Sequence, residues 1–103
     1  MEKLIRDGKV AVLYSPGYGA GWYSWNAKYA ACIFDPDVAK IILGESEGNV
    51  EKIVKAKYGE DFYFGSSLQN LTVEWLPVGT RFYIDEYDGF ESIRTTDDLS
   101  FTA

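Results

Sequence analysis

The sequence predicts an α+β fold: a mostly antiparallel sheet of four or five strands with two or three helices packed on one face. Three observations predict it. An apolar run, Lys9 to Tyr14, comes early in the chain, helical spacing follows up to about residue 58, and apolar and polar residues alternate from residue 71 onward. With 103 residues there is room for one hydrophobic core, so we expect a single domain over residues 1–103.

The run from Lys9 to Tyr14 is apolar on both faces, which predicts a central strand. Residues 1–8 before it are expected to form a frayed start or an edge element, which the turn pair Asp7-Gly8 closes. A loop over residues 15–26 follows, and it is rich in glycine and aromatic residues.

Helices are expected in the next third of the chain. A short one is predicted over about 26–34, where alanines favour helix formation. A second begins at Asp35-Pro36, because Asp accepts hydrogen bonds from free N–H groups and Pro fits the first helical position; Gly44 ends it. A third, over about 46–58, has an apolar face and lysines near its C-terminal end.

Strands dominate the remainder. Residues 61–64 predict a short strand, and residues 65–67 a loop. Alternation predicts further strands over 71–76, 81–87 and 90–95. Asp88-Gly89 between the last two is a strong hairpin signal. Residues 96–103 are expected to be a polar tail, with Leu99 and Phe101 as anchors.

Composition excludes several kinds of chemistry. There is no histidine, so there is no His general base, His-centred triad or His metal ligand. The lone Cys32 lies in an apolar run and is expected to be a buried small hydrophobe; one cysteine forms no internal disulfide and no thiolate zinc site. A net charge of −6 disfavours direct nucleic-acid binding. We therefore predict no catalytic residue, no metal and no cofactor.

The start of the chain is charged, and no stretch has the ~18 apolar residues that a membrane helix requires. The sequence is therefore expected to be that of a soluble cytoplasmic protein without membrane contact.

The loop at residues 15–26 is the first candidate site. Its glycines permit crowded backbone conformations, and successive N–H groups can hold an anion. The P-loop and dinucleotide patterns are both absent, however. The alternative is a tight turn whose rings seal the core. The predicted ligand- or partner-binding residues are Tyr18, Gly19, Ala20, Gly21, Trp22, Trp25 and Asn26, together with Glu86.

Glu86 belongs to an acidic hairpin with Asp85, Asp88 and Glu91. Alternation separates these carboxylates, which favours solvated charges over a catalytic pair. Glu86 is singled out because it continues an apolar face, and it is expected to pair with Arg81, Arg94 or a loop amide. A cross-strand pair between Glu74 and Arg81 is also expected.

Several short motifs together form a signature that spans most of the chain. They are Tyr18-Gly19-Ala20-Gly21-Trp22 with Ser24-Trp25-Asn26, Asp35-Pro36, Leu71-Thr72-Val73-Glu74-Trp75-Leu76-Pro77 with Gly79-Thr80-Arg81-Phe82, and Asp85-Glu86-Tyr87-Asp88-Gly89 with Glu91-Ser92-Ile93. The signature resembles a group of small, largely uncharacterised bacteriophage-encoded proteins. The resemblance implies an accessory protein that acts in an infected bacterial cytoplasm, and it brings no catalytic residue with it. Such proteins often block a host enzyme or sequester a small defence signal.

Three hypotheses follow. The first is a non-enzymatic accessory or anti-defence protein whose loop and adjoining hairpin ends bind a host protein or a nucleotide-like ligand. The second is a small metal-assisted hydrolase that uses Asp85, Glu86 or Asp88. The third is a structural module that forms homo-oligomers through an edge strand or an aromatic patch.

Overall fold

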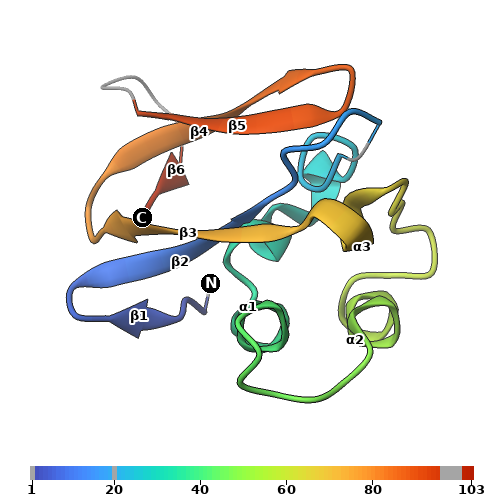
Figure 1. The fold of residues 1–103 in the computed structure, drawn as a ribbon, viewed down its shortest axis with the longest axis horizontal. Coiled ribbons are helices and arrows are strands. Elements are labelled where there is room, and N and C mark those ends of the chain that lie inside the picture. Colours follow the sequence, from blue (N-terminus) through green and yellow to red (C-terminus); the bar gives the residue numbers. More distant parts are fainter. Residues whose placement is uncertain (1, 20, 96–100) are drawn as a thin grey trace.

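The computed structural model describes residues 2–19, 21–95 and 101–103. It confirms an α+β fold, but the strands form two antiparallel sheets of three strands each, where one sheet of four or five was predicted. The first sheet has the order β1-β2-β3 and the second β5-β4-β6 (Figure 1). The strands are β1 (Ile5–Arg6), β2 (Lys9–Tyr14), β3 (Thr72–Pro77), β4 (Arg81–Tyr87), β5 (Phe90–Thr95) and β6 (Phe101–Thr102).

The strand β2 is central in the first sheet, as predicted. It pairs with β1 on one side and with β3 on the other, and residues 10–13 are fully buried. Asp7 and Gly8 both have positive φ, which makes β1 and β2 a two-residue hairpin.

The second sheet forms around the predicted Asp88-Gly89 turn. Both residues again have positive φ, and Tyr87 pairs with Phe90 across the turn. On the other edge of β4, Phe101 of β6 pairs with Phe82, which confirms Phe101 as an anchor of the tail. Leu99 lies outside the described residues.

The helices are η1 (Ala27–Phe34), α1 (Pro36–Ile42), α2 (Val50–Lys57) and α3 (Ser67–Asn70). The 3-10 helix η1 is interrupted at Tyr29, whose φ and ψ are not helical. The side chains of Asp35 and Asn49 cap α1 and α2. The capping at Asp35 was predicted, whereas α3 was not.

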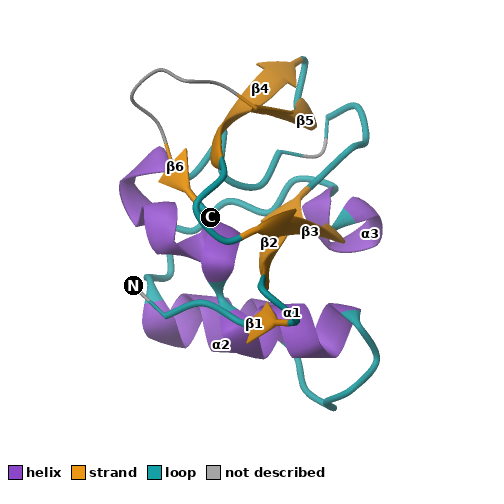
Figure 2. Cartoon of the chain, turned by 90° about the vertical axis from the view of Figure 1, so that its left-hand side faces the viewer, coloured by secondary structure: helices purple, strands orange, loops and turns teal. Residues whose placement is uncertain are grey.

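Figure 2 shows the layers: α1 and α2 lie on one side of β2 and β3, and the hairpin of β4 and β5 lies on the other. This arrangement buries both faces of β2. The core includes Val12 and Leu13 of β2, Ile33 of η1, Val38 of α1 and Phe82 of β4.

The single predicted sheet fails at the connection between β3 and β4. The turn residue Val78 donates to the carbonyl of Gly8, and Gly79 donates to Ala103, which in turn donates to Thr80. The C-terminal strand therefore occupies the edge of β4 that β3 was expected to occupy. Because β3 and β4 do not pair, the expected cross-strand pair of Glu74 and Arg81 does not form as a ladder neighbour.

The predicted strand at residues 61–64 is also wrong. This segment is a turn followed by irregular chain. The backbone of Tyr63 pairs with the side-chain amide of Asn26 rather than with a strand, and Phe62 is buried against the ring of Trp22. In the part of the chain that is described, no helix is long and apolar enough to cross a membrane.

Candidate functional site

The glycine-rich loop lies against the tip of the β4–β5 hairpin. The amide of Gly19 donates to the carbonyl of Asp88 at 2.7 Å, and the amide of Gly21 donates to the carbonyl of Gly89 at 2.8 Å. The amide of Glu91 donates to the carbonyl of Ser15 at 2.9 Å. These bonds extend the pairing of β5 onto the loop, and Figure 1 shows the two segments side by side at one end of the molecule.

A buried carboxylate fixes the rest of the loop. Glu91 is fully buried, and its two oxygens accept hydrogen bonds from the backbone amides of Ser15, Trp22 and Ser24 at 2.8–2.9 Å. The hydroxyl of Ser24 donates to it as well, at 2.8 Å. A carboxylate that accepts several N–H bonds is well stabilised away from water, and it holds each donor in place.

Two predicted site residues, Trp22 and Asn26, are part of the packed interior. The indole of Trp22 is fully buried, donates to the carbonyl of Cys32 at 3.0 Å and packs on Phe62. The side chain of Asn26 donates to the carbonyls of Trp22 and Tyr63 and accepts from the amide of Tyr63. These two side chains join the loop to the segment before α3.

Other rings at the same end of the molecule face solvent. Tyr18 is 67% exposed and Tyr87 is 75% exposed, whereas Phe90 is 36% exposed. The ring of Tyr18 lies 5.0 Å from Phe90 and 6.5 Å from Tyr87 between centroids. We call these three residues the aromatic end. Within the loop, Trp25 is 36% exposed and packs on the exposed Tyr63.

The predicted acidic residues of the hairpin serve the hairpin itself. Glu86 is exposed and accepts a hydrogen bond at 2.5 Å from the amide of Gly89, which lies in the turn of its own hairpin rather than in the glycine-rich loop. Asp85 accepts from the amide of Glu86 and lies 3.5 Å from Arg94. Among the described residues, no three acidic or cysteine side chains gather as metal ligands would.

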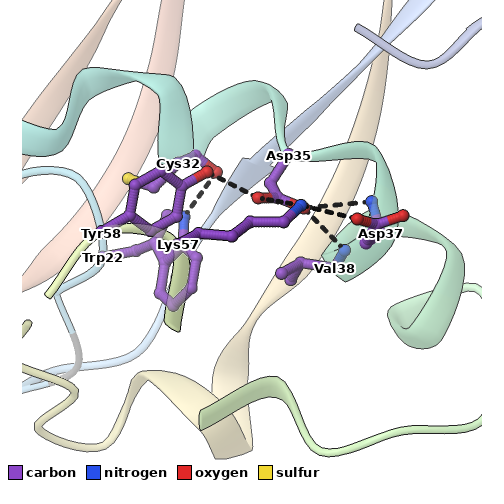
Figure 3. A network of polar contacts seen from close by, with 7 residues as sticks. All are labelled: Trp22, Cys32, Asp35, Asp37, Val38, Lys57 and Tyr58. Atoms are coloured by element: carbon purple, nitrogen blue, oxygen red, sulfur yellow. Dashed lines mark hydrogen bonds and ion pairs between the residues drawn. The ribbon is translucent and has the colours of Figure 1, made fainter. Parts of the chain in front are cut away.

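A second polar cluster joins α1 to α2 (Figure 3). The carboxylate of Asp35 is almost fully buried and accepts from the amides of Asp37 and Val38 at 3.0 Å. It also accepts from the ammonium of Lys57 at 3.1 Å and from the hydroxyl of Tyr58 at 2.5 Å. The cap of α1 is thereby connected to the last turn of α2.

The electrostatics of this cluster oppose nucleophilic chemistry. Burial raises the pKa of the Cys32 thiol, and the nearby carboxylates of Glu91 and Asp35 raise it further. Burial, followed by the bond to Asp35, raises the pKa of Tyr58. Burial acts to lower the pKa of Lys57, but hydrogen bonds to Asp37 and Asp35 outweigh it and the pKa rises. The thiol and the phenol stay protonated and the amine stays charged, which suits a structural tie.

The structure therefore separates the predicted site residues into groups. Tyr18 and Trp25 offer rings to solvent, Trp22 and Asn26 lie in the interior, and Gly19 and Gly21 use their amides to bind the hairpin. Ala20 lies outside the described residues.

Glu91 was expected to be one of the solvated acids of the hairpin, which is wrong because Glu91 is fully buried, and neither Tyr87 nor Phe90 was singled out from the sequence. Glu91 shares a strand face with Ile93, and an acid on an apolar face is the signal that was assigned to Glu86 instead. No local pattern distinguishes the two acids.

Comparison of the chain with protein families, with characterised proteins and with solved structures finds no match.

Proposed function

We propose that this chain is a non-enzymatic binding protein, an accessory or anti-defence factor of a bacteriophage, and that its aromatic end binds a basic segment of a host protein. The observation that carries the proposal is the contact of the exposed ring of Tyr18 with those of Tyr87 and Phe90, on a backbone that is fixed by hydrogen bonds. Aromatic residues on a rigid base lose little conformational entropy when they bind, and they are enriched at protein interfaces.

The charge around the aromatic end supports a basic partner. Asp85, Glu86 and Asp88 are exposed on the same hairpin, and the whole chain carries a net charge of −6. Lysine and arginine side chains can lie over tyrosine faces and pair with neighbouring carboxylates at the same time.

The hydrogen bonds of the loop favour a protein over a nucleotide as the partner. Several amides that could hold a phosphate at this loop already donate: those of Gly19 and Gly21 to the hairpin, and those of Trp22 and Ser24 to Glu91. It would also lie close to the Glu91 carboxylate, which repels an anion.

The proposal can be tested by affinity capture from a bacterial lysate, followed by direct binding of each purified captured protein. Tyr18→Ser and Tyr87→Ser are expected to abolish binding, whereas Tyr83→Ser, at an exposed tyrosine in the middle of β4, retains it. Far-ultraviolet circular dichroism checks that the variants fold. Binding that survives the first two substitutions would contradict the proposal.

The nucleotide alternative is tested in parallel by titrating AMP and cyclic AMP while following tryptophan fluorescence. A saturable response that Tyr87→Ser leaves unchanged and that a substitution at Gly19 removes would favour a nucleotide at the loop.

One observation favours the oligomer hypothesis as a second candidate. The amide of Ala11 donates to the carbonyl of Leu4, on the side of β2 that faces away from β3. Ala11 and its partner Trp75 are therefore a pair without hydrogen bonds between them. The amide and carbonyl of Trp75 consequently point away from β2, toward the outer edge of β3. The outer edge of β3 pairs with no other strand in the described part of the chain.

A second observation opposes self-pairing at this edge. Glu74 is exposed on β3, and pairing of two copies would bring like charges together. Sedimentation velocity at several concentrations decides between monomer and oligomer.

A further inference from the structure

A pocket of about 290 Å³ lies at the turn between β1 and β2, and it takes no part in the proposed function. Its lining residues are Arg6, Asp7, Lys9 and Trp75. Figure 1 shows that this turn is at the opposite side of the molecule from the tip of the β4–β5 hairpin. The pocket is therefore independent of the aromatic end.

Strand register explains why these side chains meet. Arg6 pairs with Lys9 across the first hairpin, and Trp75 pairs with Ala11, two residues beyond Lys9 on the same strand. Residues directly opposite each other, and residues two apart on one strand, project from the same face of a sheet. The indole and the two cationic side chains therefore share one face.

The two cationic side chains, Arg6 and Lys9, differ in whether another side chain already neutralises their charge. The guanidinium of Arg6 donates two hydrogen bonds of 2.5 Å to the carboxylate of Glu45, and it lies 5.9 Å from the centre of the Trp75 ring. Its charge is largely balanced by Glu45. Lys9 makes no side-chain hydrogen bond or ion pair with any residue that the structure describes. Its ammonium is available to an anion that enters the pocket.

We propose that this pocket binds a small planar organic anion, with its ring against the indole of Trp75 and its anionic group on the ammonium of Lys9. The volume is at the lower end of the range for ligand pockets, which suits one ring system with one anionic group. Arg6 forms the side wall and, held by Glu45, keeps the indole in position. The carboxylate of Asp7 at the turn disfavours ligands that carry more than one anionic group.

The test is a titration monitored by the chemical shifts of backbone amide and indole N–H groups. AMP and benzoate are the probes that carry both a ring and an anionic group. Adenosine, which has no anionic group, and inorganic phosphate, which has no ring, are the controls. We expect saturable shifts at the β1–β2 turn and at the Trp75 indole with AMP or benzoate, and weaker binding of adenosine and phosphate. Whether the pocket prefers a phosphate or a carboxylate as the anionic group of its ligand follows from which probe, AMP or benzoate, binds more tightly.

Substitutions complete the test. Lys9→Gln is expected to weaken binding about tenfold, the loss of one charge-assisted contact. Lys52→Gln, on the exposed face of α2, is the matched control and leaves binding unchanged. Trp75→Leu removes the stacking surface, and its fold is checked from the remaining amide shifts. The proposal is overturned if AMP and benzoate give no localised shifts up to about 10 mM, if phosphate alone or adenosine binds as tightly, or if Lys9→Gln binds like the wild type.

Discussion

The carboxylate of Glu91 accepts a hydrogen bond of 2.9 Å from the backbone amide of Trp22, 69 positions earlier in the chain. The same carboxylate accepts from the amides of Ser15 and Ser24, so one side chain of the second sheet sets the path of the loop that follows β2. All of these donors are neutral groups. The loop that presents Tyr18 is thus built around an acid that is itself hidden from solvent.

Replacing Glu91 by alanine is expected to destabilise the protein by about 3 kcal/mol or more, because a hydrogen bond to a charged group contributes about 1.5–3 kcal/mol and the abandoned amides stay buried. Glu91→Gln is expected to lose less, since its one remaining oxygen can still accept from Trp22 and Ser24 while its NH₂ group faces the amide of Ser15. Urea unfolding measures the free energy of unfolding of both variants. The control is Glu47→Gln, at an exposed acid outside both sheets, for which a change within about 0.5 kcal/mol is expected. Equal stability of Glu91→Ala and Glu47→Gln would contradict the assigned role.

Two glycines of the loop form a matched pair for substitution. Both have positive φ, 69° at Gly19 and 58° at Gly21. A Cβ at Gly19 would meet no atom of the described residues within 4 Å, whereas a Cβ at Gly21 would lie 2.4 Å from Cδ2 of Trp25. Gly19→Ala is therefore expected to cost only the backbone strain of about 1–2 kcal/mol.

Gly21→Ala is expected to cost about 1 kcal/mol more than Gly19→Ala, because the Trp25 ring, which packs on Tyr63, must shift to admit the methyl group. Thermal unfolding compares the two, and a shift of tryptophan emission in Gly21→Ala alone reports the displaced ring. If both substitutions change stability and emission equally, the close packing of Trp25 on Gly21 does not contribute to the stability of the loop.

The polar contacts between α1 and α2 depend on the buried Asp35 more than on the exposed Asp37, although both carboxylates contact Lys57. Asp35→Ala removes a helix cap and leaves the hydroxyl of Tyr58 without its acceptor, so we expect a loss of about 2–4 kcal/mol. Asp37→Ala removes only an exposed ion pair and is expected to cost less than about 1 kcal/mol. Chemical denaturation of the two variants checks the difference, and a reversed order would contradict it.

Stability is expected to fall as the pH rises above about 9. In the unfolded chain, Cys32 and Tyr58 release their protons at the ordinary pKa values of 9.0 and 10.0, whereas in the folded protein both pKa values are raised. The folded state then holds more protons than the unfolded state, so each rise in pH favours unfolding. The raised pKa of Lys57 acts with the same sign.

Unfolding free energies measured between about pH 8 and pH 11 check this slope. Tyr58→Phe is expected to flatten the profile above about pH 10, because the phenol no longer contributes. A profile of the wild type that is flat across the whole interval would show that these groups titrate alike in both states.

The sequence by itself determined the features that depend on a few neighbouring residues. The pairs Asp7-Gly8 and Asp88-Gly89 form hairpin turns because their φ angles are locally accessible to Asp and Gly. Asp35 caps α1 because its side chain reaches amides only two and three residues ahead. The α+β class and the central position of β2 follow from periodicity and from a run that is apolar on both faces.

Only the tertiary structure decided how the strands divide into two sheets and which rings and acids face solvent. Phe101 of β6 pairs with Phe82 on the edge of β4 that β3 was predicted to take, and Ala103 bonds to the turn between β3 and β4. Glu91 and Glu86 have similar sequence surroundings, yet one is fully buried and the other exposed. The difference comes from amides about 70 residues away. Such pairings depend on the packing of the whole chain, and a local pattern of residues carries no record of them.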